Sequence, residues 1–426
     1  MTSTQQAETG VIDAGRWPDV AVVRGPAARA EIARVLFRAA VSPLPVRVRL
    51  PGGRALGAGS PGTPVMTLHN PGAFFTRLGS GGLIGLGESY MAGEWDCTDL
   101  TGLVTVFATH IRELVPGPLR RLRRMAVRRQ PTADEQTRTG ARRNISRHYD
   151  LSNDFFALFL DETMTYSSAL FETALFDEPL GGKTPAGLAP SLAQSQRRKV
   201  DRLLDQAAVG PGCRLLEIGT GWGELAIRAG QRGAEVRTVT ISAEQHALAT
   251  RRVAQAGLAG QVSVELRDYR DVSGEFDAIC SVEMIEAVGE RYWDTYFAQL
   301  DGLLAPGGRV ALQAITMPHD QMLASRRTYT WIQKYIFPGG LIPSLTAIED
   351  SLSRTRLRVA GRLEFGDCYA QTLAIWREAF LARGHEVTAL GFDEVFIRMW
   401  LFYLCYAEAG FRAGYLNVNQ LTLERA

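Results

Sequence analysis

A glycine-rich turn after a short apolar run is the first feature of this chain that could bind a ligand. The run at 215–218 ends in Glu217 and Ile218, and Gly219, Gly221 and Gly223 follow at every second position before a helical stretch. Glycines let the backbone turn sharply and approach a ligand where a Cβ would block it. A strand before such a turn and a helix after it favour a nucleotide-type site, and a tight turn without a ligand is the alternative.

Polar side chains after the next two strand-like runs could complete that site. Thr240, Ile241 and Gln245 follow the second run, and Asp268 and Tyr269 follow the third. Carboxylate, hydroxyl and amide groups can hydrogen-bond ribose hydroxyls and the edge of an adenine ring. The glycine spacing differs from the G-x-G-x-x-G fingerprint, and no acid ends the second run to grip a ribose. A nicotinamide dinucleotide is therefore disfavoured.

The elements around these residues alternate in type. Strand-like runs fall at 213–218, 235–241, 262–266, 276–281 and 309–315, and helical stretches at 223–230, 243–256 and 292–304 separate them. This rhythm predicts an α/β fold with a doubly wound parallel sheet, whose ligands bind at the carboxyl ends of the strands.

The first part of the chain has a different texture, with short extended runs at 45–50 and 64–68 and an amphipathic helix at 27–40. We expect a small N-terminal α+β domain over 1–111, a basic linker or amphipathic helix over 112–140, and the catalytic domain over 141–426.

The net charge of +2 over 426 residues hides an uneven distribution, because residues 112–147 hold eleven arginines against three acids. If 119–129 is helical, its apolar residues share one face and most of its arginines take the other, which is typical of a helix on an anionic membrane surface. A solvated linker is the alternative. The candidate phosphate-contacting residues are Arg120, Arg121, Arg123 and Arg124.

The composition excludes several classes of protein. With 46% hydrophobic and 22% charged residues, the chain can build a core and is neither disordered nor collagenous. The near-neutral charge does not favour nucleic acid as a partner. No signal peptide or uninterrupted apolar run of membrane-spanning length is present, and the five cysteines are irregularly spaced. These features predict a reduced, cytoplasmic protein without a metal site.

The glycine turn and the polar strand ends resemble those of class I methyltransferases that use S-adenosylmethionine. Longer segments resemble the cyclopropane fatty acid synthase family, in the family's order, at 85–97, 144–171, 281–289, 331–345, 365–376 and 398–414. The resemblance implies a Rossmann-like sheet with a helical cap. It also implies a small N-terminal domain for membrane docking and dimerisation, hence a homodimer lying on phospholipid at the inner face of the cell membrane. The implied cofactor-binding residues are Tyr166, Ser167, Glu217, Gly219, Gly221, Gly223, Thr240, Ile241, Gln245, Asp268 and Tyr269.

In this family the methyl acceptor is a carbon–carbon double bond in a phospholipid acyl chain. An alkene is a poor nucleophile, so the methyl donor must be held in line with it in a dry pocket. The resulting carbocation needs shielding, aromatic faces and a base. The matching segments supply many aromatic side chains, each of which is individually more typical of core than of catalysis: Tyr149, Phe155, Phe156, Phe159, Tyr166, Trp331, Tyr335, Tyr369 and Trp376.

Family members hold a bicarbonate ion as the base, and this chain keeps only part of that site. Glu286 and Tyr369 match two of the bicarbonate ligands, whereas Ser168 stands in place of a Cys and Gln313 in place of a His. Glu283 stands where Gly is usual. If Glu283 and Glu286 share a helical turn, their spacing puts both carboxylates on one face, which raises one pKa and disfavours a bound anion. We hypothesise that Glu283 alters or replaces bicarbonate; a solvent-facing or helix-capping Glu283 is the alternative.

The altered pocket resembles the actinobacterial branch that converts oleoyl lipids into 10-methylene stearoyl lipids. That product is our first expectation, and a cyclopropane ring is the alternative. A separate reductase would be needed to saturate the methylene group. Two other classes stay open: a noncatalytic lipid-binding subunit, and a methyltransferase for soluble small molecules, which would not need the N-terminal segment.

Overall fold

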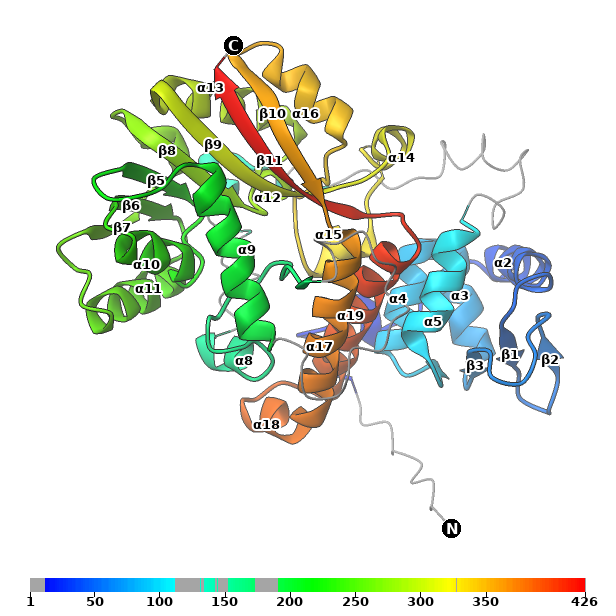
Figure 1. Cartoon of the computed structure of the whole chain (residues 1–426). Coiled ribbons are helices and arrows are strands. Elements are labelled where there is room, and N and C mark those ends of the chain that lie inside the picture. Colours follow the sequence, from blue (N-terminus) through cyan, green and yellow to red (C-terminus); the bar gives the residue numbers. More distant parts are fainter. Residues whose placement is uncertain are drawn as a thin grey trace. The chain divides into compact units, whose positions relative to one another are not determined.

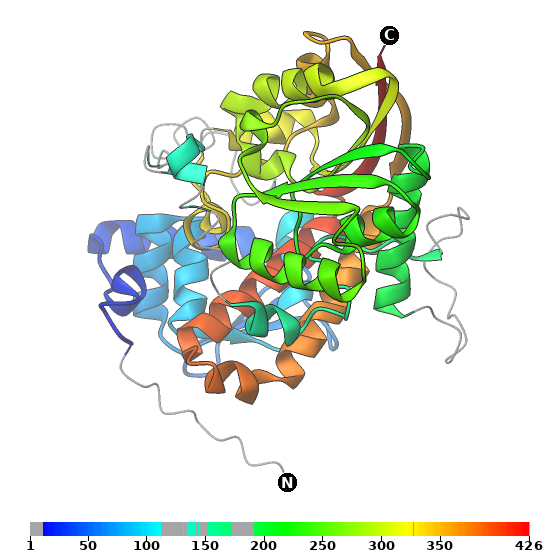
Figure 2. The same cartoon turned by 90° about the vertical axis from the view of Figure 1, so that its left-hand side faces the viewer.

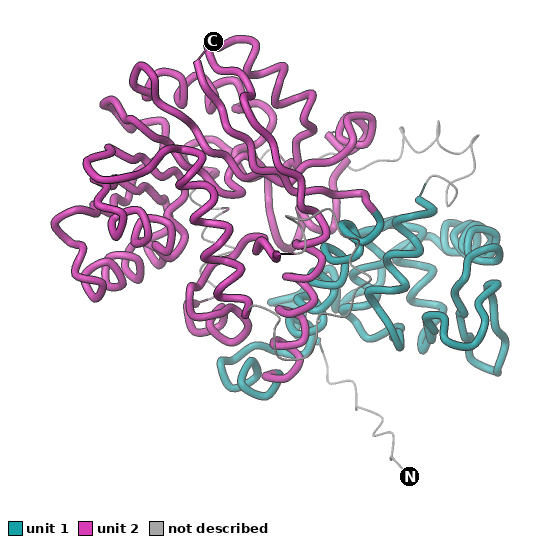
Figure 3. Tube along the Cα trace, viewed as in Figure 1, with its two compact units in different colours: residues 1–126, 384–413 teal, residues 127–383, 414–426 magenta. Residues whose placement is uncertain are grey.

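The computed structural model describes residues 12–111, 131, 134–141, 144, 152–172, 191–326 and 328–425. The chain forms two compact units, one from residues 1–126 and 384–413 and the other from 127–383 and 414–426 (Figure 3). Arg120, Arg121, Arg123 and Arg124 lie outside the described residues, so the proposed basic helix stays a prediction.

The second unit is built on a seven-stranded sheet with the order β10-β11-β9-β8-β5-β6-β7 (Figures 1 and 2). Neighbouring strands from β9 through β7 pair in parallel, whereas β11 runs antiparallel to both β9 and β10. The predicted runs correspond to the parallel strands β5 to β9. The strands β10 and β11 were not predicted, and they make the sheet mixed instead of purely parallel. The strands are β5 (Arg214–Ile218), β6 (Glu235–Thr240), β7 (Val262–Leu266), β8 (Phe276–Val282), β9 (Leu304–Thr316), β10 (Leu357–Glu364) and β11 (Asn417–Arg425).

Two apolar layers cover opposite faces of this sheet. Successive strand side chains alternate between faces, and Leu215 accordingly packs in the layer with α9 (Leu192–Gln206), α10 (Glu224–Gln231) and α11 (Ala243–Gln255). Leu216 packs in the other layer, with α13 (Trp293–Leu303) and α16 (Leu345–Leu352). The predicted doubly wound architecture is therefore confirmed.

Shorter helices and the long α17 complete the second unit. The helix α12 directly follows β8, and α17 carries residues of the 365–376 segment. The remaining helices are α8 (Asn153–Ala157), η3 (Tyr269–Asp271), α12 (Ile285–Val288), η4 (Glu290–Tyr292), α14 (His319–Ser325), α15 (Trp331–Tyr335) and α17 (Gly366–Ala382).

The first unit contains a four-stranded sheet with the order β2-β1-β3-β4 and several helices. The buried Glu94 carboxylate links α3 to α4. Arg77 Nε of α3 donates to Glu94 Oε1 over 2.8 Å, and Ser89 Oγ of α4 donates to Glu94 Oε2. The elements are α1 (Pro18–Ala21), α2 (Ala27–Val41), β1 (Arg47–Arg49), β2 (Ala55–Leu56), β3 (Val65–Leu68), α3 (Pro71–Gly81), α4 (Leu83–Met91), β4 (Trp95–Cys97), α5 (Leu100–Thr109), α18 (Gly384–Ala389) and α19 (Glu394–Arg412).

The division into units differs from the predicted one at residues 384–413, which pack with the N-terminal segment rather than with the 141–426 domain. The physical reason is that α19 makes polar contacts with residues of α4, β4 and α5. Arg398 donates to the carbonyls of Tyr90 and Trp95, and Thr101 donates to the buried Glu408. Among the helices the structure describes, none is long and apolar enough to cross a membrane.

Candidate active site

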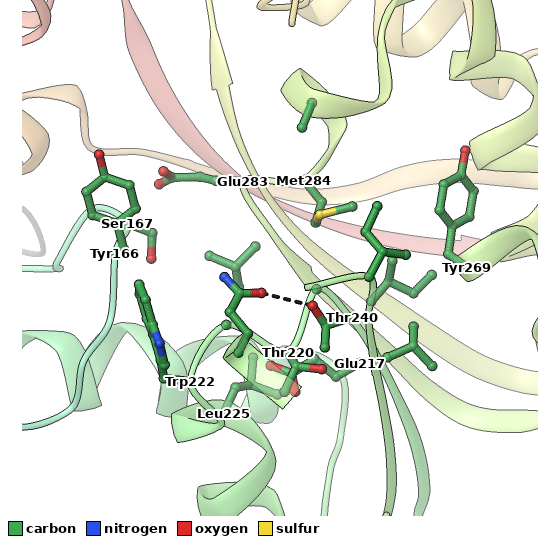
Figure 4. A pocket seen from close by; sticks show the side chains of 18 of the residues that line it. Tyr166, Ser167, Glu217, Thr220, Trp222, Leu225, Thr240, Tyr269, Glu283 and Met284 are labelled. Atoms are coloured by element: carbon green, nitrogen blue, oxygen red, sulfur yellow. Dashed lines mark hydrogen bonds between the residues drawn. The ribbon is translucent and has the colours of Figure 1, made fainter. Parts of the chain in front are cut away.

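A pocket in the second unit lies where β5, β6 and β8 end, as expected for a parallel sheet. Tyr166, Ser167 and Glu283 lie toward one end of this pocket and Tyr269 toward the other (Figure 4). Of the predicted cofactor-binding residues, the pocket is lined by Tyr166, Ser167, Glu217, Gly219, Gly221, Thr240, Ile241, Gln245, Asp268 and Tyr269.

The glycine turn forms one wall of the pocket and depends on left-handed backbone at each glycine. Gly219 has φ +97°, and a Cβ there would meet Met284 Cγ at 2.6 Å. Gly221 has φ +51° and no atom within 4 Å of such a Cβ. Gly223 does not line the pocket; it caps α10 with φ +93° and lies close to Ala249. The first two glycines therefore shape the ligand surface, and the third packs helix against helix.

The Thr240–Gln245 pair presents an amide to the pocket. Thr240 Oγ1 donates to Gln245 Oε1 over 2.9 Å, and Ser242 caps α11 by accepting from the Gln245 backbone N–H. Since the amide oxygen takes the Thr240 bond, the Gln245 amide nitrogen remains available to donate. This arrangement suits a ribose hydroxyl.

Asp268 is held by a residue that sequence reasoning missed. Arg270 Nε and Nη2 donate to the two Asp268 oxygens over 2.8 and 2.6 Å. Burial raises the pKa of the Asp268 carboxyl, but these bonds outweigh it and lower the pKa below its ordinary value. The Arg270 guanidinium also lies 5.5 Å from the ring centroids of Tyr269 and Tyr292. An arginine two residues after the acid was the available signal.

Glu217 lies buried at the foot of the glycine turn, where its Oε2 accepts a 2.6 Å bond from Thr238 Oγ1. Burial raises the pKa of Glu217 to about 8. A positively charged ligand in the pocket would favour the ionised form of this carboxyl. The acid that precedes the glycines is thus suited to a cationic ligand.

A second cluster converges on the Glu283 carboxylate at the Tyr166 end of the pocket. Glu283 Oε1 accepts from the Ser168 backbone N–H over 3.0 Å and from Gln313 Nε2 over 2.9 Å. Glu283 Oε2 accepts from Tyr369 OH over 2.8 Å. The three donors come from the segment after α8, from β9 and from α17. The structure therefore gathers Ser168, Gln313 and Tyr369 around Glu283.

The placement of Glu283 corrects the expected helical geometry. Glu283 follows β8 with φ +50°, and α12 begins only at Ile285, so Glu283 and Glu286 do not share a helical turn. The backbone N–H of Glu283 donates to Gln313 O over 2.8 Å, which continues the β8–β9 pairing. The alternatives of a solvent-facing or helix-capping Glu283 are also wrong, because its carboxylate lies among three donors.

The two glutamates still influence each other. Burial raises the pKa of Glu283. Burial and then the Glu283 charge raise the pKa of Glu286 to about 8. Glu286 Oε1 accepts from the Ile315 backbone N–H, whereas the buried Oε2 has no hydrogen-bond partner among the described residues. Glu286 is therefore mainly protonated at neutral pH.

Tyr166 and Trp222 line the same end of the pocket, and further aromatic rings pack behind them. Tyr166 stacks on Trp376 with ring centroids 5.2 Å apart, and Tyr369 meets Trp376 edge-on at 6.2 Å. Phe156 packs against both Tyr166 and Trp222. Of the predicted aromatic residues that the structure describes, only Tyr166 lines the pocket, and Phe155, Phe156 and Trp376 are fully buried. Tyr149 lies outside the described residues.

Sequence reasoning also missed the buried Lys199, which reaches the pocket from α9. Its Nζ donates to Ser167 Oγ over 2.6 Å. The only signal was its rarity, because the chain has three lysines among 47 cationic residues.

The profile of the mycolic acid cyclopropane synthetase family matches residues 136–421. This chain belongs to that family. The tuberculostearic acid methyltransferase UfaA1 of Mycobacterium tuberculosis is 54% identical over 99% of this chain and 98% of its own length. The cyclopropane-fatty-acyl-phospholipid synthase of Escherichia coli K12 is 35% identical over 83% of this chain and 86% of its own length.

A solved family structure supports the interpretation of the pocket. Mycolic acid cyclopropane synthase CmaA1, complexed with SAH and CTAB, aligns with a TM-score of 0.59 and 29% identity over 70% of this chain and 99% of its own. The chain is thus an S-adenosylmethionine-dependent methyltransferase of the cyclopropane synthetase family. The glycine cradle, the Thr240–Gln245 amide and the acids of the pocket fit that cofactor.

Replacing Gly219 with Ala should weaken cofactor binding. A side chain at φ +97° is strained by ~1–3 kcal/mol and would also displace Met284, so we expect S-adenosylhomocysteine to bind at least ~10-fold more weakly by calorimetry. Gly257→Ala is the matched control, because Gly257 has φ +72°, open space around it and no part in the pocket. Equal affinity loss in both variants would contradict a binding role for Gly219.

Proposed function

We propose that this enzyme transfers a methyl group to the double bond of an oleoyl-type phospholipid chain and forms a 10-methylene branch. The observation that carries this proposal is the Glu283 carboxylate held by Ser168, Gln313 and Tyr369 beside the cofactor pocket. The 54% identity to a tuberculostearic acid methyltransferase supports the choice of substrate and product.

When bound, S-adenosylmethionine supplies an electrophilic methyl group on a sulfonium ion. The chain's own residues must then keep water away from an alkene that reacts only weakly as a nucleophile. Tyr166 and Trp222 line the end of the pocket that holds Glu283, and the buried rings of Trp376 and Phe156 pack behind Tyr166. The π faces of Tyr166 and Trp222 can stabilise positive charge on the acyl chain, and their bulk excludes water that would capture it.

The reaction then requires a base. As the carbon–sulfur bond breaks, the alkene electrons form a carbon–carbon bond to the methyl group and leave a carbocation on the neighbouring acyl carbon. A hydride shift moves the cation to the methyl-bearing carbon. Glu283 takes a proton from that methyl group, and the freed C–H electron pair forms the exocyclic double bond. The balanced products are the methylene lipid, the neutral thioether and protonated Glu283.

Glu283 takes the place that the family resemblance gives to bicarbonate. The positions implied for bicarbonate ligands, Ser168, Gln313 and Tyr369, all donate to Glu283 in this structure. Glu286, the fourth, lies close enough for the Glu283 charge to raise its pKa. A further anion would lack donors and would meet carboxylate repulsion, so the residues present do not fit a bound bicarbonate.

The same arrangement favours the methylene product over a cyclopropane. Both products lose a proton from the transferred methyl group, and they differ in whether a hydride shift precedes that loss. Three hydrogen bonds fix the orientation of the Glu283 carboxylate, so it takes a proton only from a methyl group that lies within its reach. If the new methyl group must first move into that reach, the hydride shift has time to occur. Saturation to a methyl branch would need a separate reductase.

Product analysis tests the proposed reaction directly. Expression in a host rich in oleoyl phospholipid should give fatty esters that are heavier by one CH2 in mass spectrometry, with exomethylene signals in NMR. The physical reason is the delayed proton loss from the methyl group. Cyclopropane signals would instead support the alternative product, and unchanged fatty esters would contradict lipid alkylation.

Replacing Glu283 with Gln should lower turnover by at least ~100-fold, because general bases contribute about that much, while S-adenosylhomocysteine binding persists. The activity of the parent enzyme should fall as the pH is lowered, because only the ionised form of Glu283 can act as the base. The fall should begin at a pH above the ordinary pKa of glutamate, because burial raises the pKa of Glu283. Glu286→Gln is the comparison and should cost less, because an amide mimics the protonated acid. Unchanged turnover in Glu283→Gln would exclude Glu283 as the base.

We also propose that the N-terminal unit contacts an anionic phospholipid surface. On α2, Ala28, Ile32, Val35 and Ala39 form an exposed stripe at helical spacing, opposite the buried face, with Ile32 and Val35 each 60% exposed. Exposed arginines flank it, and residues 22–54 hold seven arginines against one acid. A cationic surface with an apolar stripe suits a membrane interface. The basic 112–140 segment and a homodimer remain further proposals.

Ile32→Asp with Val35→Asp should weaken binding to phosphatidylglycerol vesicles, because the double change buries less apolar surface and adds repelling charge. Sedimentation with vesicles measures it, and added salt should weaken the parent protein's binding as well. Leu266→Asp is the control, since Leu266 is 54% exposed in the other unit. Equal binding by the double variant and the parent would refute this surface.

A further inference from the structure

Lys199 is a fully buried cation that lacks an anionic partner. Its side chain is 0% exposed and lines the cofactor pocket. Its Nζ donates to the neutral Ser167 hydroxyl over 2.6 Å, and no carboxylate of the described residues lies within 4.0 Å of it. An ammonium group offers three donors, so two remain for other acceptors.

The other cations that line the pocket are already paired. Arg267 contacts Glu265 over 3.1 Å, and Arg270 contacts Asp268 over 2.6 Å. Lys199 is attracted only at longer range by Glu283 from β8, Asp161 from the segment after α8, Glu224 from α10 and Glu217 from β5. A buried charge without a close partner is costly. In agreement with this geometry, burial lowers the pKa of Lys199 to about 8.

The two ends of the binding site carry different groups, and this difference suggests which part of the cofactor lies beside Lys199. Asp268 and Tyr269 lie with the groups that suit an adenine and ribose, and Figure 4 places Ser167 at the opposite end from Tyr269. The amino-acid portion of the cofactor must therefore lie toward Ser167. That portion carries the cofactor's only anionic group, a carboxylate.

We infer that Lys199, with the Ser167 hydroxyl, anchors the carboxylate of the cofactor's amino-acid portion. The inference deepens the assigned cofactor site and rests on cofactor binding, not on the lipid substrate. Because Ser167 Oγ accepts from Lys199, the Ser167 proton is free to point to the carboxylate. Gln196 Nε2 donates to Ser167 O over 2.8 Å, so α9 holds both anchoring groups in place.

Calorimetry with two ligands tests the anchor. Lys199→Met should bind S-adenosylhomocysteine ~10–100-fold more weakly, as expected for the loss of a charge-assisted bond. It should bind 5′-methylthioadenosine, which lacks the amino-acid portion, as the parent does. Lys334→Met is the control, because Lys334 does not line the pocket. Equal losses for both ligands, or no loss for either, would overturn the inference.

Thermal stability separates an anchor from a structural lysine. Methionine has a similar length without the unpaired charge, so Lys199→Met should melt at the same or a higher temperature than the parent in the absence of ligand. A stability loss that accompanies the affinity loss would point to a merely structural role for the Lys199–Ser167 bond.

The pH dependence provides a third readout. Carboxylate binding favours protonated Lys199, so the ratio of variant to parent Kd for S-adenosylhomocysteine should be largest below pH 8. It should shrink toward one as the lysine loses its proton at higher pH. Nearby groups such as Glu217 titrate in both proteins, so their effect on Kd largely cancels in this ratio of variant to parent. A ratio independent of pH would overturn the inference, and this lipid-free assay leaves the proposed reaction to its own test.

Discussion

The three hydrogen bonds to the Glu283 carboxylate are the constraint on which the rest of the active site depends. They link segments far apart in the sequence: Ser168 after α8, Gln313 in β9 and Tyr369 in α17. The β8–β9 pairing holds Glu283 at its left-handed φ of +50°, and Gln420 in β11 donates to Gln313 from the opposite side. The antiparallel addition to the sheet therefore helps to orient the proposed base.

The charge balance of the site follows from the burial of its titratable groups. Burial raises the pKa of Glu217 and Glu286 to about 8 and lowers that of Lys199 to about the same value. Without a ligand, Glu217 and Glu286 are thus close to their neutral forms at neutral pH, whereas Lys199 keeps its proton until the pH approaches 8. A ligand with one cationic centre and one carboxylate would favour ionisation of both types, so the pocket gains its full charge complementarity only when such a ligand is present.

The parts of the structure that were predictable are those set by local pattern. Alternating apolar runs located β5 to β9, and the glycine spacing located the ligand turn. The strand β10 was missed because every second residue of this edge strand is exposed and Gly361 interrupts its apolar positions. The strand β11 was missed because Asn417, Asn419 and Gln420 interrupt its apolar residues. The role of Lys199 depends on a contact across the fold with Ser167, whereas Arg270 bonds an acid only two residues away. Glu283 also depends on contacts across the fold, because its strained backbone is fixed by β9 and not by its own helix.

The departures from the family pattern at Gln313 and Glu283 are physically coupled. A histidine at 313 could become cationic, pair with Glu283 and lower its basicity further, whereas the Gln313 amide is neutral and has a fixed donor. A cysteine at 168 would add no stronger donor, because the bond to Glu283 comes from the backbone N–H. With glycine at 283, the donors from Ser168, Gln313 and Tyr369 would have no carboxylate to bond, and a small anion could take its place. Glu283 and Gln313 therefore form one unit: glycine at 283 alone would leave the donors unsatisfied, and a histidine at 313 alone could add a charge beside the base. The bond from Ser168 does not depend on its side chain, because the backbone N–H donates it.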